Sequence, residues 1–301
     1  MFNIISKRRY TYVFSALVVA VSIFALLSWG LKLGIDFKGG TLMEVEFSQN
    51  TPSVEEMRGA LDPVGVESLI VQPSDNNRVL LRYIASDEEQ NQGVLSALKS
   101  FDENVVQHNV DFVGATISDQ LRSNAVTAIA VAIIVITLYI AWAFRKVSFP
   151  VPSWHYGIGA IIALVHDVLI VLGIFAFLGV FFNVEIGIPF VAALLTILGY
   201  SVNDTIVIYD RIRENLLHTK NFDDFESLVN KSLNESLARS VNTSGTLIVV
   251  LIAIIFFGGG ALTWFAAALL IGVISGTYSS IFVATALLVT SHKRKQKIKN
   301  T

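Results

Sequence analysis

Long runs of apolar residues alternate with polar segments along this chain. A helix needs about 20 consecutive apolar residues to cross the hydrocarbon core of a membrane, and six runs reach or approach that length. They cover residues 10–29, 124–144, 154–180, 188–208, 240–257 and 262–290. The pattern predicts an α-helical polytopic membrane protein with six transmembrane helices. It leaves residues 31–122 as one polar segment between the first and second spans.

The first apolar run follows three basic residues, Lys7, Arg8 and Arg9, which is also how a secretory signal peptide begins. The run is longer than the apolar part of a signal peptide, and no pair of small residues typical of a cleavage site follows it. We therefore expect residues 1–30 to hold a short cytoplasmic N-terminus and an uncleaved first span.

A different pattern governs residues 31–122, where short alternating runs are separated by signals for the start of a helix. Ser53 with Glu56, and Ser86 with Glu89, have the spacing of a capping box. Alternation of apolar and polar positions predicts strands between these helices. The expected strands cover residues 41–48, 68–72, 78–84 and 105–112, and the expected helices cover residues 53–61 and 86–101. The order β-α-β-β-α-β predicts a small α+β domain of ferredoxin-like fold.

Composition and charge agree with this division. Hydrophobic residues make up 53% of the chain and charged residues 15%, which is more apolar than a typical soluble domain. The chain has no cysteine, which excludes disulfides, thiolate metal ligands and cysteine nucleophiles. Outside residues 31–122, the basic residues are confined to residues 7–9, 145–146, 211–239 and 293–299. Six spans place all of them on one side, and the positive-inside rule makes that side cytoplasmic. We expect both termini inside and residues 31–122 outside.

Ionisable residues within a span are costly unless they are paired or hydrated, so each is a candidate for function. Asp204 lies near the end of the fourth span, among the small or polar residues Gly199, Asn203 and Thr205. Arg239 heads the fifth span, at a depth compatible with that of Asp204. A carboxylate placed between hydrocarbon and a cation can take up and release a proton. We expect Asp204 to carry a proton path with Arg239 and Asn203; the alternative is a structural carboxylate in a helix-packing network.

His166 and Asp167 form a third candidate site, in the middle of the third span. Adjacent residues of a helix point about 100° apart, so both side chains cannot face one spot. We expect one of them to serve a proton relay while the other makes a packing contact. Asp167 is the preferred candidate for the proton path.

Two further patterns concern packing. Gly272 and Gly276 have the small-xxx-small spacing of a helix interface, and Gly199 is a further packing candidate. The segment 209–239 is expected to be a cytoplasmic amphipathic link that lies on the membrane surface. Its apolar face consists of Phe225, Leu228, Val229, Leu233 and Leu237. The basic tail, residues 291–301, is expected to lie near anionic lipid.

Several motifs match one known family in order. They are residues 34–41 (GIDFKGGT), His166 with Asp167, residues 198–215 (LGYSVNDTIVIYDRIREN), Arg239 with residues 243–246 (TSGT), and residues 276–284 (GTYSSIFVA). The chain resembles the SecD/SecF family of the bacterial Sec protein-export system, which belongs to the resistance–nodulation–division superfamily of proton-coupled transporters.

The resemblance implies an auxiliary translocase subunit in the bacterial inner membrane, and not an enzyme. It implies that SecD is a partner, that the SecYEG channel and an unfolded secretory polypeptide are contacted, and that YajC and YidC belong to the same assembly. It also implies that Asp204 and Arg239 match the family's proton-conducting pair. No SecD half is present in this chain, so the second half of the transmembrane core is expected from another chain. Neither a cofactor, a metal nor a nucleic acid is expected.

Two other functions are compatible with parts of the pattern. A related proton-coupled exporter of small molecules or lipids would normally have about twelve spans. An intramembrane aspartyl protease needs two convergent aspartates, one of them in a Tyr-Asp pair such as Tyr209-Asp210. Asp204 and Asp210 lie six residues apart, or about 120° around one helix, and so should not converge.

Overall fold

The computed structural model describes residues 2–48, 51–74, 77–84, 88–145, 151–218, 224–258 and 260–299. The chain divides into two compact units. The first contains Met1–Lys32 and Val126–Thr301, and the second contains Leu33–Ala125. Each unit is described by itself.

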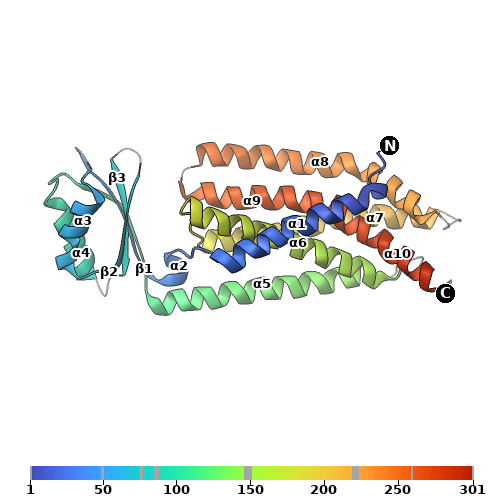
Figure 1. Cartoon of the computed structure of the whole chain (residues 1–301), viewed down its shortest axis with the longest axis horizontal. Coiled ribbons are helices and arrows are strands. Elements are labelled where there is room, and N and C mark those ends of the chain that lie inside the picture. Colours follow the sequence, from blue (N-terminus) through green and yellow to red (C-terminus); the bar gives the residue numbers. More distant parts are fainter. Residues whose placement is uncertain are drawn as a thin grey trace. The chain divides into compact units, whose positions relative to one another are not determined.

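Within the described residues, six helices are long and apolar enough to cross a membrane, as the sequence predicts. They run over Ile5–Trp29, Ala115–Ala143, Ser153–Phe181, Ile188–His218, Phe225–Phe257 and Leu262–Arg294. The elements are labelled α1 (Arg8–Trp29), α5 (Ala115–Ala143), α6 (Ser153–Phe181), α7 (Ile188–His218), α8 (Phe225–Phe257), α9 (Gly260–Ser279) and α10 (Thr285–Lys299) (Figure 1). A π-helical turn, η3 (Ser280–Ala284), joins α9 to α10.

Helix α9 lies at the centre of the helical unit, because it packs against α6, α7 and α8, while α1 packs against α6. Small residues allow these close approaches, since helices in a membrane associate through tight packing and hydrogen bonds. A Cβ atom built on Gly272 of α9 would lie 2.3 Å from the Ile197 side chain of α7. One built on Gly276 would lie 3.0 Å from Ser201 Cβ. Both glycines therefore face α7.

The segment 209–239, expected to be a cytoplasmic amphipathic link, consists mainly of the end of one long helix and the start of the next. Helix α7 continues to His218, and α8 begins at Phe225 and runs without a break into the fifth span. Residues 219–223 lie outside the described residues.

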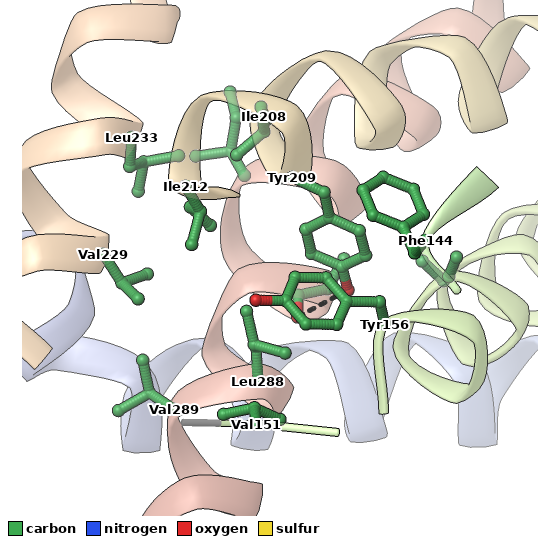
Figure 2. Close-up of a cluster of buried hydrophobic side chains, with 14 of the residues drawn as sticks. Phe144, Val151, Tyr156, Ile208, Tyr209, Ile212, Val229, Leu233, Leu288 and Val289 are labelled. Atoms are coloured by element: carbon green, nitrogen blue, oxygen red, sulfur yellow. Dashed lines mark hydrogen bonds between the residues drawn. The ribbon is translucent and has the colours of Figure 1, made fainter. Parts of the chain in front are cut away.

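The apolar face of that segment is covered by protein. Phe225, Val229 and Leu233 are at most 2% exposed, and Leu228 and Leu237 pack beside them. Figure 2 shows Val229 and Leu233 facing a cluster built by neighbouring helices. Its other labelled members are Phe144, Val151, Tyr156, Ile208, Tyr209, Ile212, Leu288 and Val289. Amphipathicity reports only that one face is apolar, and here α7 and α10 supply an apolar partner for that face within the chain.

Polar contacts join the start of α1 to α8 and α10. Glu226 at the start of α8 accepts a hydrogen bond from Arg8, 2.6 Å away, and also pairs with Lys293 of α10. Asn230, one turn further along α8, accepts from the backbone N–H of Ile4 at 2.9 Å. The two ends of the chain's described part therefore meet on one end of the helical unit.

The second unit has the predicted order β-α-β-β-α-β. Its elements are β1 (Gly40–Glu46), α3 (Val54–Leu61), β2 (Glu67–Pro73), β3 (Arg78–Ile84), α4 (Glu88–Lys99) and β4 (Val106–Val113), with the short helix α2 (Ile35–Lys38) and the turn η2 (Asp62–Val64). The antiparallel sheet has the strand order β2-β3-β1-β4, which is the order of a ferredoxin-like fold. The expected ferredoxin-like domain is confirmed.

Alternation along the central strands decides which face of the sheet is covered. Met43 and Val45 of β1 and Leu81 of β3 are at most 1% exposed and pack with Met57 of α3 and Leu98 of α4. Each such side chain stabilises the fold by about 1.5–3 kcal/mol relative to an exposed one. The intervening residues, such as Glu44 and Glu46, lie on the opposite face.

Two local signals in this unit have different outcomes. The capping box at the start of α3 is confirmed, with Ser53 Oγ accepting from the Glu56 N–H at 3.3 Å and Glu56 Oε2 accepting from the Ser53 N–H at 2.8 Å. The second predicted box begins at Ser86, and residues 85–87 lie outside the described residues.

Gly40 opens β1 with a φ of 118°, and a Cβ there would lie 2.8 Å from the Tyr83 carbonyl oxygen. Only glycine fits that position.

Candidate functional site

Asp204 is a buried carboxylate on α7 with a single hydrogen-bond donor among the described residues. Its side chain is 8% exposed, and Oδ1 accepts a hydrogen bond from Ser240 Oγ of α8 at 2.6 Å. Its second oxygen, Oδ2, is buried and has no partner in the part of the chain that the structure describes. An ionised carboxylate needs about four hydrogen-bond donors to replace its hydration. Asp204 is therefore under-solvated for a permanent negative charge.

Arg239 and Asn203 lie near Asp204 but face the outside of this chain. Both side chains are exposed, as are Asn242 and Thr243 on α8. Within the described residues, Arg239 forms no ion pair with Asp204, because Ser240 occupies the bonded oxygen and the other is unpaired. Exposed polar residues on a membrane-spanning helix are unfavourable against lipid tails. These residues form a polar stripe, which polar groups of another chain would stabilise better than lipid. The stripe consists of Asn203, Arg239, Asn242 and Thr243.

Asp167 of α6 has the opposite environment, because its carboxylate is completely buried and fully bonded. Ser201 of α7 donates to Oδ2 at 2.6 Å, and Ser279 of α9 donates to the same oxygen at 2.7 Å. Ser275 of α9 donates to Oδ1 at 2.8 Å, and His166 Nδ1 lies 2.9 Å from Oδ1. Asp167 thus joins α6, α7 and α9 through one polar cluster.

The two carboxylates are connected through α7, where Ser201 precedes Asp204 by three residues and so lies about one turn away. A second polar seam joins α8 to α9. Ser244 Oγ donates to the Ser240 carbonyl at 2.7 Å and lies 2.6 Å from Thr277 Oγ1. Any movement of α7 or α8 around Asp204 must therefore rearrange hydrogen bonds to α9.

The π-helical turn η3 is held in place by α7. Thr205 Oγ1 lies 2.8 Å from Ser280 Oγ, and the Tyr209 hydroxyl donates to the Ala284 carbonyl at 3.1 Å. Figure 2 shows this last bond as the dashed line from Tyr209. A π-helical turn leaves backbone groups without regular helical partners, and such turns concentrate at functional sites. Here a tyrosine of α7 donates a hydrogen bond to a backbone carbonyl of that turn.

The glycines named from the sequence have different surroundings. Gly272 and Gly276 contact α7, as described above. A Cβ on Gly199 would have no neighbour within 4 Å among the described atoms. Gly199 is exposed on the same helix as Asn203. It does not pack against another helix in the described part of this chain, since it points away from the bundle.

The arrangement does not fit an aspartyl protease. Asp204 is buried against Ser240, whereas the Asp210 side chain is 64% exposed and accepts from Arg213 at 3.3 Å. Tyr209, which would belong to the catalytic pair, is bonded to a backbone carbonyl. The two carboxylates do not converge on one substrate atom. Among the described residues there is also no group of three or more His, Cys, Asp or Glu that could hold a metal ion.

Sequence reasoning selected Asp167, Asp204 and Arg239 as candidates but did not predict that serines of neighbouring helices bond the two carboxylates. Ser275 with Ser279, and Ser240 with Ser244, are spaced four residues apart and so share a helix face. Two such serine pairs within apolar spans are a signal that could have identified the faces of α8 and α9 that turn inward.

Comparison with known proteins identifies relatives over most of the chain. Residues 93–294 match the model of the C-terminal region of the protein export membrane proteins SecD/SecF, and residues 24–51 match the SecD/SecF GG motif. The protein translocase subunit SecF of Thermobaculum terrenum is 43% identical over 302 residues, covering 96% of this chain and 94% of that protein. The SecF subunit of Desulfurispirillum indicum is 40% identical, covering 94% and 89%.

Solved structures of SecDF have a similar fold. The crystal structure of SecDF from Thermus thermophilus, a translocon-associated membrane protein, aligns with a TM-score of 0.82 at 35% identity, over 96% of this chain and 38% of that chain. SecDF in a super-membrane-facing form aligns with a TM-score of 0.69 at 33% identity, over 99% of this chain and 40% of that chain. This chain spans about two fifths of each SecDF chain.

Proposed function

We propose that this chain acts with SecD to couple the proton motive force to polypeptide export. The chain belongs to the SecD/SecF family of protein export membrane proteins and is an auxiliary subunit of the Sec translocase. In this proposal the polypeptide emerges from the SecYEG channel and is pulled or released on the outer side. YajC and YidC are further proposed neighbours, on family resemblance alone.

The observation that carries the proposal is the buried Oδ2 of Asp204, which has no hydrogen-bond partner among the described residues. A carboxylate with one donor in a membrane span is stabilised when it binds a proton and destabilised when it loses one, unless a cation or new donors approach. Its charge is therefore tied to the arrangement of α7 and α8. An elementary charge that crosses the membrane potential gains about 2.3 kcal/mol per 100 mV. A few protons suffice to drive a conformational change of several kcal/mol.

The polar stripe beside Asp204 supports a partner in the membrane. Asn203, Arg239, Asn242 and Thr243 are exposed in this chain, where lipid would leave them without partners. The SecDF chains are more than twice as long as this one. We assign the stripe to the contact with SecD, whose half of the transmembrane core would bring further polar groups to Asp204 and Arg239.

The distribution of basic residues supports an orientation in the bacterial inner membrane. Arg8 and Lys293 meet at Glu226, at the end of the helical unit where α8 begins. The positive-inside rule assigns this end to the cytoplasm. Both termini then lie in the cytoplasm, and the ferredoxin-like domain between α1 and α5 lies on the outer side, where an exported polypeptide emerges.

The test replaces Asp204 with asparagine, which keeps the shape and removes the ionisable group. D210N is the matched control, because Asp210 lies on the same helix but is exposed and belongs to no part of the proposed path. Export of a secreted protein is measured in inverted membrane vesicles with and without a proton gradient. We expect D204N to lose the gradient-dependent part of export, while D210N retains it. Gradient-stimulated export by D204N at the parental rate would refute the proposal.

A further inference from the structure

We propose that a groove between α1 and α6 binds the acyl chains of one phospholipid molecule. The groove encloses a cavity of about 490 Å³ and runs along the second half of α1, from Leu17 to Trp29. Its other wall is the C-terminal part of α6, from Gly173 to Phe177. This lipid site lies apart from Asp204 and does not depend on the proposed role in export.

Small residues make the floor of the groove and large residues make its rims. Ser22 and Ala25 of α1 are each 4% exposed, and a Cβ atom on Gly173 of α6 would lie 2.4 Å from Ser22 Cβ. The two helices therefore touch along the floor. Val21 and Phe24 of α1 are 58% and 62% exposed and line the same cavity. The groove is thus closed toward the protein and open toward the surroundings of the helices.

The chemistry of the lining selects a hydrocarbon ligand. Among the described residues that line the groove, none is ionisable, and only Ser22 and Trp29 have a polar atom in the side chain. A ligand with charges or many polar groups would lose its hydrogen bonds to water here without replacement. Hydrocarbon loses none, and both walls belong to helices that are long and apolar enough to span a membrane.

The groove has the length of one leaflet of a bilayer. Leu17 and Trp29 are twelve residues apart on α1, or about 18 Å along the helix axis, and half of a hydrocarbon core is about 15 Å thick. The Trp29 ring packs edge-on against Phe177 and Phe181, with centroids 6.2 and 5.5 Å apart. Tryptophan is typical of the membrane–water interface. The groove therefore runs from the interface at Trp29 to the middle of the bilayer at Leu17.

The volume of the cavity distinguishes a lipid from a partner helix. One helical turn is about 5.4 Å long and 10 Å across, which is about 420 Å³, so the cavity holds little more than a single turn. Non-bonded carbon atoms pack about 4 Å apart, so an acyl chain that crosses one leaflet fills about 200–300 Å³. The cavity thus matches the two chains of a phospholipid. The orientation proposed above places this lipid in the outer leaflet.

The experiment uses phosphatidylethanolamine that carries a photoactivatable diazirine on one acyl chain. The probe is incorporated into membranes that contain the intact protein, which is then purified in detergent. Gel filtration removes lipid that dissociates, and the retained lipid is cross-linked by illumination. We expect the cross-links, mapped by mass spectrometry, to concentrate on residues 17–29 and 173–177. Cross-links spread evenly over exposed apolar faces, such as that of α5, would overturn the proposal.

Two tryptophan substitutions on α1 provide the matched comparison. V21W fills the groove from an exposed position, whereas L27W adds the same side chain at a residue that is 83% exposed and outside the lining. We expect labelling of the groove to fall several-fold in V21W and to persist in L27W. Unchanged labelling in V21W would overturn the proposal, and the mapping in the parent protein requires neither variant to fold.

The same labelling is carried out on the complex purified with SecD, because a helix of another chain is the competing occupant. We expect the cross-links on residues 17–29 to persist in the complex. Their loss there would show that a partner covers the groove and would overturn the lipid assignment. Export by D204N has no bearing on these results, so the proposed function and the lipid site fail independently.

Discussion

Replacing Gly173 with alanine tests the close contact between α1 and α6, the helix that carries His166 and Asp167. A Cβ atom at Gly173 would lie 2.4 Å from Ser22 Cβ and 2.5 Å from Ser22 Cα of α1. The nearest atoms include backbone, so a change of side-chain rotamer cannot relieve the overlap. Gly157 lies on the same helix and provides the matched control, because a Cβ atom there would meet no other atom within 4 Å among the described residues.

The two substitutions should differ in sign. Non-bonded carbon atoms pack about 3.5–4.0 Å apart, so G173A forces α1 and α6 to separate by about 1 Å. Overpacking of this kind costs about 1–3 kcal/mol. Alanine is favoured over glycine within a helix by about 1 kcal/mol, a gain that both variants share. G157A should therefore be slightly more stable than the parent, and G173A less stable than G157A by about 1–3 kcal/mol.

The measurement is thermal unfolding of the purified full-length protein in one detergent, followed by intrinsic fluorescence and by retention on gel filtration. The two variants and the parent are compared at equal protein concentration. We expect an unfolding midpoint for G173A that lies several degrees below that of G157A. Equal midpoints for the two variants would refute the reasoning, because α1 would then not approach α6 as closely as the structure shows.

Two further predictions concern the cytoplasmic end of α8 and the ferredoxin-like domain. L233A should lower the free energy of unfolding by about 2–5 kcal/mol in the same thermal assay, because Leu233 is 0% exposed and its truncation leaves a cavity. The control is L217A, at a residue that is 74% exposed. Equal unfolding midpoints for the two variants would show that the Leu233 side chain is not packed inside the protein. Hydrogen bonds from the His108 imidazole and the Arg78 guanidinium lower the pKa of Glu46. Because this pKa is below its unfolded value of about 4.3, the stabilisation is complete above that pH and disappears as the pH falls through the folded-state pKa. Backbone amide hydrogen exchange in β1 and β4, corrected for the intrinsic rate, should therefore be faster in E46Q than in the parent at neutral pH. At acid pH the two proteins should exchange at equal rates, and a difference that persists in acid would contradict this account.

The spans and the ferredoxin-like domain were predictable because their signals are local. A run of about 20 apolar residues, an alternation of period two and a capping box each depend on neighbouring residues only. The ends of the helices were less predictable. Helix α7 continues ten residues beyond the predicted end of its span, to His218, because no proline or glycine stops it and its apolar face finds partners such as Leu233.

The candidate residues were predictable for a related reason, since a charge within an apolar run is conspicuous in the sequence. Asp167, Asp204 and Arg239 were selected as candidates in this way, and the resemblance of their motifs to one family pointed to transport. Their relative importance was not predictable. The sequence ranks Asp167 below Asp204, whereas the structure gives Asp167 the larger set of hydrogen bonds.

The order of apolar and charged residues determined by itself that this chain crosses a membrane six times and carries a folded domain after the first span. Tertiary structure alone decided which carboxylate is saturated and which has an oxygen without a partner in the described part of the chain. The physical reason is that hydrocarbon excludes water, so the donors to Asp167 and Asp204 must come from side chains on other helices. Ser201, Ser240 and Ser279 are ordinary residues in the sequence, and only helix packing brings them to the carboxylates.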